Sequence, residues 1–294
     1  MRYLPKMQQL QVFQEVVNQG SIRAAARILG QSQPAISRTL KELEHMLETS
    51  LFVRSPLGIT LTPSGQLFVV RSRTILEELK RAGDEIRFLH TQHSVVKVAL
   101  NDMLSLTVLP EVLEQFHQQL PLTRLWVQDR GLHPQLLTGE LDFAVSPQPA
   151  VLPDGLSIQP LFKASLSIVA NRHHPQARAH DLQQLKGNKW LFAGEESEVA
   201  VRQDVHLATF FQQLEQPPVY THSLSYGLQL VQQANYLMLL PHPLLRRFNT
   251  TLRALAIPAI PSLHYAALWS KQSPLTASAQ RLLMLIRQAC KRVT

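Results

Sequence analysis

The sequence predicts an α/β protein built from two different parts. Residues 1–90 show short apolar helical patterns that end in one long helix, whereas the chain from Val95 alternates β-branched runs with helical patterns. Hydrophobic residues make up 45% of the chain and charged residues 17%, which is typical of a globular protein. At 294 residues the chain is long enough for more than one domain, each with its own core.

The stretch from Ser21 to Leu40 is predicted to form two short helices joined by a tight turn. Ser21 and Ser32 each precede a helical pattern and can cap it, because a serine hydroxyl accepts a hydrogen bond from an unpaired N–H of the first turn. Gly30 lies where the first helix must end, and Pro34 falls in the first turn of the second helix, where a missing N–H costs little. A preceding helix over residues 7–18 is expected to cover this pair with one apolar stripe: Leu10, Phe13, Val16 and Val17.

The second helix of the pair has an apolar face and a polar face. Its apolar residues recur at helical spacing: Ile36, Leu40, Leu43 and Leu47. Its polar front supplies the candidates for contact with a DNA groove: Ser32, Gln33, Pro34, Ser37, Arg38 and Lys41. Gln33 and Ser37 suit base edges and Pro34 a thymine methyl, whereas arginine and lysine suit phosphates. An ordinary helical hairpin with a solvated face fits the same spacing.

Two further elements are predicted before residue 90. Residues 51–54 and 59–62 form a small β hairpin around Ser55-Pro56-Leu57-Gly58, with Arg54 as a candidate for a phosphate or minor-groove contact or as a plain surface arginine. A long helix then runs from Pro63, with Thr62 as its cap, to about residue 90. Its residues recur with a heptad-like spacing, which favours the pairing of two subunits over packing within one chain: Phe68, Ser72, Ile75, Leu79, Ala82, Ile86 and Leu89. Residues 91–94 are then expected to form a polar hinge.

The strings SIRAAARILGQSQPAISRTLKELE and LFVRSPLGITLTPSG resemble the N-terminal domain of LysR-type transcriptional regulators. The resemblance implies a winged helix-turn-helix DNA-binding domain at 1–62, a linker helix for dimerisation at 63–90 and an effector-binding domain at 91–294. It also implies a homo-oligomer, either a dimer or a dimer of dimers, that binds double-stranded promoter DNA and contacts RNA polymerase. The expected function is sequence-specific transcriptional regulation controlled by a small-molecule effector.

The second part of the chain is predicted to form two α/β lobes. Strands are expected at residues 95–100, 123–128, 141–145, 156–162, 166–170, 190–193, 219–222, 236–240 and 265–269. Single helices are expected at 104–120 and 276–291, and a short one at 135–138. The chain should cross between lobes near Lys163-Ala164, so that lobe 1 takes about 95–163 and 264–294 and lobe 2 about 164–263. Two lobes with two crossovers resemble periplasmic binding proteins, which close on a ligand by hinge motion.

Polar residues at the predicted strand ends are the candidates for effector binding, because ligands of parallel sheets lie beyond the carboxyl ends of the strands. They are Asn101, Asp102, Ser146, Ser223 and Ser225. Residues of these types before helices are usually caps, and only their joint placement around one predicted cleft favours effector binding. Ser225 is the expected cap of the helix after residue 222. A charged loop is expected at residues 195–202, either solvated or bordering the cleft.

The second part of the chain also shows likeness to the family, together with two departures from it. Residues 139–145, GELDFAV, match a family signature, whereas residues 129–138 look shorter than in most members. Asn235 stands where many members have a glycine-rich turn. With YAALWSK at 265–271 and LPKMQQLQVFQEVV near the N-terminus, this feature looks most like the subgroup that contains the regulator of the threonine-degradation operon.

Composition and the absence of certain motifs argue against several other classes of protein. The net charge of +8 favours a polyanionic partner, and a single cysteine, Cys290, excludes an internal disulfide framework and fits a reducing cytoplasm. No signal peptide or apolar run long enough for a bilayer is visible, so no membrane association is expected. No zinc set, nucleophile elbow or phosphate-binding loop occurs, so neither a metal, a cofactor nor an enzyme activity is expected. A non-specific architectural DNA-binding protein and an enzyme on the two-lobed fold are the alternatives.

Overall fold

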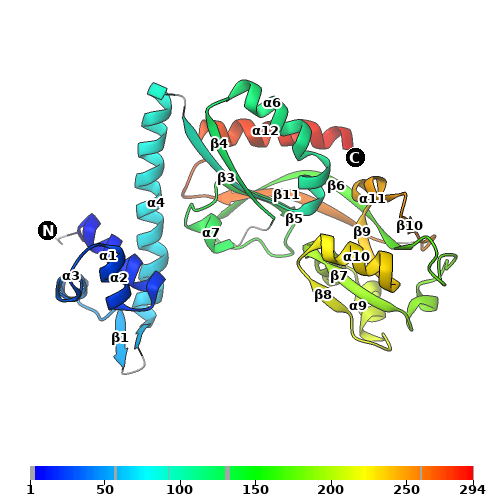
Figure 1. Ribbon diagram of the computed structural model, residues 1–294, viewed down its shortest axis with the longest axis horizontal. Helices are drawn as coiled ribbons and strands as arrows, with labels where there is room; N and C mark the ends of the chain where they lie inside the picture. Colours follow the sequence, from blue (N-terminus) through cyan, green and yellow to red (C-terminus); the bar gives the residue numbers. More distant parts are fainter. Residues whose placement is uncertain (1–3, 56–57, 92, 130–132, 259, 294) are drawn as a thin grey trace. The chain divides into compact units, whose positions relative to one another are not determined.

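The computed structural model describes residues 4–55, 58–91, 93–129, 133–258 and 260–293 (Figure 1). Internal contacts divide the chain into two units. The first unit comprises Met1–Thr91 with Leu137–Glu140, and the second comprises Gln92–Leu136 with Leu141–Thr294. No helix of the described residues is both long and apolar enough to cross a membrane.

The first unit begins with three helices whose ends are set by local sequence. They are α1 (Met7–Gln19), α2 (Ile22–Ile28) and α3 (Gln33–Met46). The hydroxyl of Ser21 accepts a hydrogen bond from the Ala24 N–H at 3.4 Å, and that of Ser32 accepts one from the Ala35 N–H at 3.3 Å. Gly30 follows α2 with a φ of +62°, a conformation that suits glycine and ends the helix. The predicted caps and turn are confirmed.

Aromatic rings form the centre of the small core in the first unit. Phe13 on α1 is fully buried, and its ring lies 5.2 Å from the Phe52 ring and 5.0 Å from the Phe68 ring. Phe52 lies in β1 (Phe52–Ser55), which pairs with β2 (Gly58–Leu61) as the expected antiparallel hairpin. Residues 56–57 of its turn lie outside the described residues. The stripe of apolar side chains predicted on α1 therefore holds the hairpin and the long helix together.

The long helix α4 (Pro63–Thr91) starts as expected, because the Thr62 hydroxyl accepts a hydrogen bond from the Gly65 N–H at 2.9 Å. Its first heptad faces the chain's own core. Ser72 is buried and accepts a hydrogen bond at 2.6 Å from the Gln14 side chain, and Phe68 contacts Phe13. Phe68 and Ser72 therefore pack within their own chain. The prediction that they pair two subunits is wrong. The remaining heptad positions with described side chains are exposed.

One mixed sheet runs through the second unit in the order β4-β3-β5-β11-β6-β9-β7-β8, with β10 also paired to β6. Lobe 1 contains β3 (Ser94–Leu100), β4 (Thr123–Gln128), β5 (Phe143–Pro147) and β11 (Ser262–Ser270), with the first half of β6 (Leu156–Asn171). Lobe 2 contains the other half of β6 with β7 (Lys189–Ala193), β8 (Val219–Thr221), β9 (Tyr236–Pro241) and β10 (Leu252–Ala254). β3 pairs in parallel with β4 and β5, and β7 pairs in parallel with β8 and β9, as an α/β fold requires.

Helices cover the sheet of each lobe. Those of lobe 1 are α5 (Asp102–Thr107), α6 (Leu109–Gln119), α7 (His133–Leu137) and α12 (Ala277–Val293). Those of lobe 2 are η1 (Leu182–Leu185), α8 (Gly194–Gln203), α9 (Val205–Gln212), α10 (Leu224–Ala234) and α11 (His242–Phe248). Cys290 of α12 is buried, and this burial raises the pKa of its thiol to about 12. The thiol is therefore protonated at neutral pH.

Three predicted elements of the second unit differ from those in the structure. The helix expected at 104–120 is two helices, α5 and α6, because Pro110 cannot donate a backbone hydrogen bond and lies in the first turn of a new helix. The strands expected at 156–162 and 166–170 are one strand, β6, whose irregular register beside Pro160 lets it continue without a break. The loop expected at 195–202 is helix α8, which begins after Ala193. The position of Asn235 in the left-handed region, with a φ of +53°, is confirmed.

Candidate DNA interface and effector site

Helix α3 has a buried apolar face and an exposed polar face, called its front. Ile36, Leu40 and Leu43 are fully buried. On the other side the polar candidates remain at the surface, with Ser37 half-buried: Ser32, Gln33, Pro34, Ser37, Arg38 and Lys41. The buried face fixes the rotation of the helix about its axis, so the exposed front is presented in one orientation.

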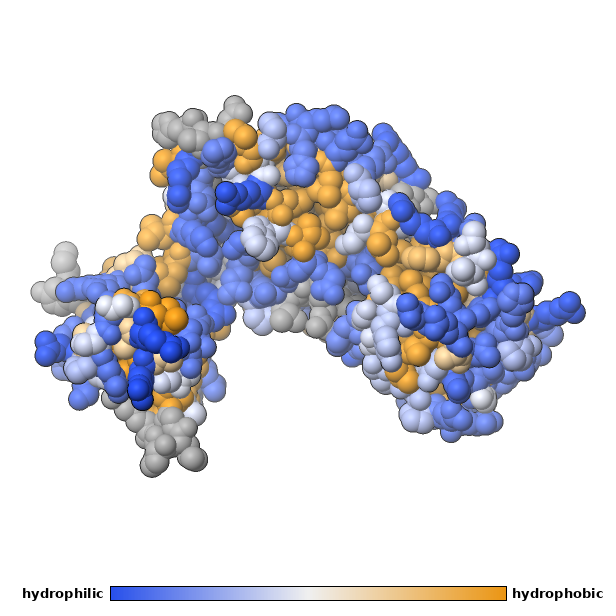
Figure 2. All heavy atoms as spheres, viewed as in Figure 1, coloured by the Kyte–Doolittle hydropathy of each residue, from blue (hydrophilic) through white to orange (hydrophobic). Residues whose placement is uncertain are grey.

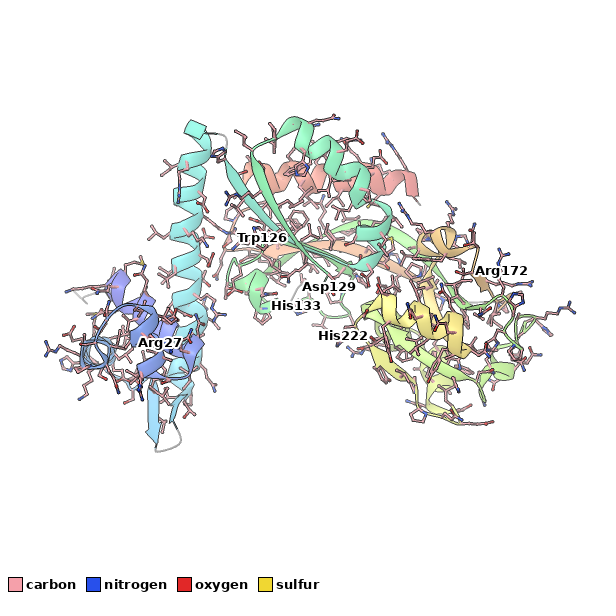
Figure 3. All side chains as sticks on the ribbon, viewed as in Figure 1. Arg27, Trp126, Asp129, His133, Arg172 and His222 are labelled. Atoms are coloured by element: carbon pink, nitrogen blue, oxygen red, sulfur yellow. The ribbon has the colours of Figure 1, made fainter. Side chains whose placement is uncertain are left out.

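Basic residues on α2 were missed in the sequence analysis. Arg23 and Arg27 are both exposed and lie one turn apart; Figure 3 labels Arg27. Their spacing of four residues on the helix that precedes the candidate recognition helix was the available signal, because that helix crosses the DNA backbone in helix-turn-helix proteins. Arg54 lies in β1, but its side chain is outside the described part of the structure.

The exposed part of α4 carries large apolar side chains. Ile75, Leu79 and Ile86 are 50%, 56% and 59% exposed, and Ala82 between them is also exposed. Their spacing of four, three and four residues places them along one stripe of the helix. Leu67 is 65% exposed but lies off this stripe. Exposed apolar patches of this kind are typical of surfaces that contact another protein.

A buried hydrogen bond joins the two lobes of the second unit. The Asn101 side chain follows β3 in lobe 1, and its Nδ2 donates to the Oε1 of Glu196 on α8 of lobe 2 at 2.8 Å. The two residues are 6% and 5% exposed. Asn101 also caps α5, since its Oδ1 accepts from the Leu104 N–H at 3.3 Å. Asn101 is therefore the helix cap that the sequence offered as the alternative to effector binding, and it also contacts the other lobe.

Glu196 belongs to the charged segment 195–202, which the sequence left as either solvated or bordering the cleft, and its carboxylate lies buried at the junction of the lobes. Gly194 precedes it with a φ of +72°, and a Cβ at that position would lie 2.7 Å from the Glu196 carboxylate. The positive φ favours glycine at this position, and a Cβ there would also displace the Glu196 carboxylate from the place it occupies beside Asn101. The available signal was the Gly–Glu–Glu order directly after a buried strand.

Tyr265 of β11 places a hydroxyl beside this hydrogen bond. Its side chain is fully buried and its ring stacks on the Phe162 ring at 4.6 Å. Burial and then the nearby charge of Glu196 raise the pKa of Tyr265 well above its usual value, so the hydroxyl keeps its proton. Within the described residues the hydroxyl makes no hydrogen bond of ordinary geometry, although the Asn101 and Glu196 side chains lie close to it. A buried polar atom in this state can still accept or donate a hydrogen bond to a bound molecule.

Asp102 lies next to Asn101 and faces lobe 2. Partial burial, followed by the charge of Asp129, raises the pKa of its carboxyl, whereas a hydrogen bond from the Leu224 backbone N–H lowers it. Leu224 is the first residue of α10, and Asp129 follows the edge strand β4. Figure 3 labels Asp129 and also His222, which follows β8. Ends of strands from both lobes thus meet at Asp102.

The candidate serines have different positions. Ser146 lies within β5, half-buried, and its hydroxyl donates to the Pro147 carbonyl at 3.2 Å. Ser223, and not Ser225, caps α10, because its hydroxyl accepts from the Tyr226 N–H at 3.2 Å. Ser225 is exposed in the first turn of that helix, so the cap expected there is wrong by two residues. The structure brings Asp102 and the start of α10 together, whereas Ser225 makes no side-chain hydrogen bond to lobe 1 within the described residues.

Asp102→Asn is expected to stabilise the second unit at neutral pH. Because the folded state raises this pKa above the ordinary value of 3.8, the folded protein binds more protons than the unfolded chain as the pH rises above that value. The stability that this carboxyl contributes is therefore lost as the pH rises from 3.8 through the raised pKa of Asp102 in the folded protein. Thermal unfolding should show a higher Tm for the variant at pH 7 and no difference below the ordinary pKa, whereas Asp154→Asn, at an exposed site, should change neither. A lower Tm at pH 7 would show that the hydrogen bond from Leu224 outweighs the burial.

The described residues contain no group of three or more histidine, cysteine, aspartate or glutamate side chains that could hold a metal ion. His174 is buried beside the Asn235 carbonyl, with its Nε2 3.2 Å from that oxygen, and burial lowers the pKa of its imidazole. It supports the turn at Asn235 rather than a site.

Comparisons with known proteins agree for both units. Residues 7–66 match the family model described as "Bacterial regulatory helix-turn-helix protein, lysR family", and residues 90–291 match the model described as "LysR substrate binding domain". The HTH-type transcriptional regulator TdcA of Escherichia coli strain K12 is 30% identical, with 97% of this chain and 93% of TdcA covered.

Solved structures show the same fold. The structure of full-length CbnR complexed with its target DNA has a TM-score of 0.67 at 21% identity and covers 97% of this chain and 99% of CbnR. Vibrio fischeri DarR in complex with DNA has a TM-score of 0.53 at 19% identity and covers 98% of this chain and all of DarR.

Proposed function

Because this chain belongs to the LysR family of transcriptional regulators, we propose that α3 reads the DNA sequence and that the junction of the two lobes binds the effector. The protein is a DNA-binding regulator with an effector-binding domain, which confirms the family and the fold expected from the sequence. The alternatives of an architectural DNA-binding protein and of an enzyme are not favoured by these matches. A role on DNA also supports the expected cytoplasmic location.

The observation that carries the DNA-binding proposal is the division of α3 between core and surface. With Ile36, Leu40 and Leu43 fully buried, the exposed Gln33 and the half-buried Ser37 form the part of the helix that can enter a major groove. A glutamine amide can form two hydrogen bonds with adenine. Basic side chains on α2 and α3 supply phosphate contacts, which set affinity and salt dependence: Arg23, Arg27, Arg38 and Lys41.

Gln33→Ala is expected to weaken binding to the preferred DNA site by about 1–3 kcal/mol while leaving binding to scrambled DNA unchanged. The preferred site is first selected from a random duplex library with the wild-type protein. Binding of both duplexes is then measured at one fixed salt concentration by fluorescence anisotropy. Gln66→Ala, which removes an exposed glutamine from α4, is the control and should affect neither duplex. An equal loss on both duplexes would make Gln33 a positioning residue and not a reader.

Two copies of the chain are proposed to pair through the exposed stripe of α4, defined above by Ile75, Leu79, Ala82 and Ile86. Burying such side chains against a second helix is worth about 1.5–3 kcal/mol for each large residue. Pairing would place two α3 helices on one duplex, as a two-fold symmetric site requires. Assembly into a dimer of dimers and contact with RNA polymerase extend this proposal on family grounds.

Leu79→Glu is expected to convert the oligomer to smaller species, because it puts a carboxylate from each subunit into the apolar seam. The dimer dissociation constant should rise by roughly a hundredfold or more, as measured by sedimentation equilibrium. Leu67→Glu makes the same chemical change at an exposed leucine off the stripe and should leave the dissociation constant unchanged. If the two variants behaved alike, the stripe would not be the interface.

The proposed effector lies where residues of both lobes meet: Asn101, Asp102, Ser146, Glu196, Ser223 and Tyr265. A ligand that binds this junction more tightly in one arrangement of the lobes shifts the population toward that arrangement by the difference in binding free energy. The hydrogen bond between Asn101 and Glu196 stabilises one of these arrangements. Ser225 remains a weaker candidate, because it is exposed in α10.

A further inference from the structure

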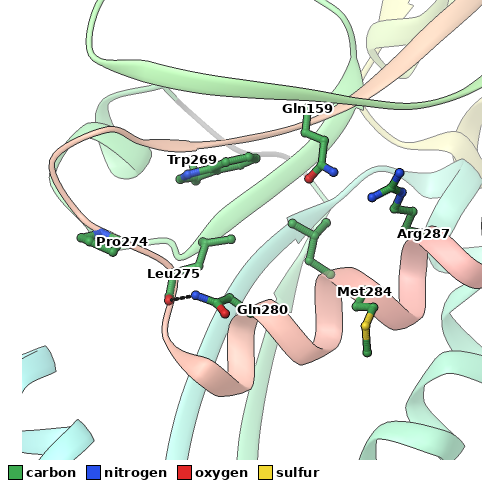
Figure 4. A pocket seen from close by; sticks show the side chains of 8 residues that line it. Gln159, Trp269, Pro274, Leu275, Gln280, Met284 and Arg287 are labelled. Carbon is green, nitrogen blue, oxygen red and sulfur yellow. Dashed lines mark hydrogen bonds between the residues drawn. The ribbon is translucent and has the colours of Figure 1, made fainter.

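A groove of about 440 Å³ lies in lobe 1 between α12 and the strands β6 and β11 (Figure 4). None of the residues proposed above for DNA, effector or subunit contact lines it. Its volume falls within the range of about 300–1,000 Å³ that is usual for small-molecule sites. The groove is therefore large enough to be a ligand site of its own.

One wall of the groove is formed by neighbouring residues of β6 and β11, and the other by one side of α12. Trp269 of β11 pairs with Ser157 of β6, and Gln159 pairs with Ala267, so Trp269 and Gln159 are diagonal neighbours on one face of the sheet. The opposite wall is one side of α12, whose lining residues recur three, one and three positions apart: Gln280, Leu283, Met284 and Arg287. The adjacent side of α12 is anchored in the core by Leu282, Leu285 and Ile286. Both walls are thus held by regular structure rather than by loops.

One part of the groove is apolar and partly flat. Trp269 presents an indole ring that is not fully buried, Leu275 lies next to it in Figure 4, and Met284 is 39% exposed. These three side chains leave apolar surface in water that a flat ring could cover. An aromatic body is the shape that this part of the groove accommodates best.

The polar groups at the groove favour an anion. Figure 4 shows Arg287 and Gln159 at the same end of the groove, and within the described residues Arg287 makes no ion pair. Gln280 lies at the other end, where its Nε2 donates to the Leu275 carbonyl at 2.8 Å. No acidic side chain is among the described residues of the lining. A guanidinium can bind a carboxylate through two parallel hydrogen bonds.

We propose that this groove binds a small aromatic carboxylate, with the ring against Trp269 and the carboxylate on Arg287. The proposal goes beyond the regulator function above and concerns a second ligand site, separate from the junction of the lobes. Charge complementarity and the flat apolar wall select this ligand class over a cation or a purely aliphatic chain.

Cinnamate is the probe, and its uncharged analogue cinnamamide tests the role of the carboxylate. Isothermal titration calorimetry of the full-length protein should show saturable cinnamate binding and weaker cinnamamide binding. Arg287→Gln should weaken cinnamate binding roughly tenfold. Lys291→Gln removes the same charge from an exposed position on α12 outside the groove and should leave the affinity unchanged. Asp102→Asn at the junction of the lobes should also leave it unchanged.

Four outcomes would overturn the proposal. The first two are that the wild-type protein shows no saturable cinnamate binding, or that it binds cinnamate and cinnamamide with equal affinity. The third is that the Arg287 and Lys291 variants lose cinnamate affinity equally. The fourth is that the Asp102 variant loses as much cinnamate affinity as the Arg287 variant. Because Arg287 is exposed, its replacement should leave the Tm unchanged, which a thermal-unfolding control verifies. Met284→Lys in sedimentation experiments tests the competing occupant, a second copy of the chain. A change of oligomeric state without cinnamate binding to the wild-type protein would assign the groove to that interface.

Discussion

Asn101→Asp is expected to lower the free energy of unfolding of the second unit by roughly 3–5 kcal/mol at neutral pH. The substitution replaces the amide that donates to Glu196 with a second carboxylate, and both positions are more than nine-tenths buried. Aspartate still caps α5 as asparagine does, so the cap at Leu104 is kept and only the contact between lobes is lost. Urea denaturation followed by intrinsic tryptophan fluorescence, to which the buried Trp190 of lobe 2 contributes, measures the change.

A matched second substitution makes this prediction specific. Glu196→Gln in the Asn101→Asp background restores one donor and one acceptor to the pair, and it should recover most of the lost stability. The single variant should also become more stable as the pH falls, because one of two neighbouring buried carboxyls then takes up a proton. If the single variant were as stable as the wild type at every pH, the hydrogen bond would not hold the lobes together.

Gly65→Ala is expected to destabilise the first unit by roughly 3 kcal/mol, or to prevent its folding, because overpacking against backbone cannot be relieved by a side-chain rotation. A Cβ at this position would lie 2.1 Å from the Leu51 carbonyl oxygen, and the start of α4 would have to move away from the hairpin. The helix and the strand cannot both keep their hydrogen bonds after such a movement. Urea denaturation followed by circular dichroism should show the loss, and DNA binding should fall with it.

Gly83→Ala is the control within the same helix. There a Cβ would meet only the end of the Arg87 side chain at 3.8 Å, so the substitution should stabilise α4 by about 0.5–1 kcal/mol through its higher helix propensity. Opposite signs at the two glycines would support the close contact between α4 and Leu51. Equal effects would contradict it.

The sequence by itself determined the features that depend on residues a few positions apart. The caps at Ser21 and Ser32, the turn at Gly30 and the two faces of α3 all follow from spacings of up to four residues. The family resemblance rested on the same local strings, which is why it could be recognised without a structure. The candidate DNA-reading residues came from this level, and their placement on the exposed front of α3 agrees with it.

Only the tertiary structure decided the features that join distant residues. The continuity of β6 through both lobes depends on pairing with β11, β9 and β10, and none of these strands is close to it in sequence. Packing of Phe68 and Ser72 against α1 removed them from the proposed subunit interface. The partner of Glu196 lies 95 residues away, so a charge that resembled a solvated surface residue proved to be buried between the lobes. Contacts between residues so far apart depend on how the helices and strands pack against one another. The spacing of residues along the chain therefore does not predict them.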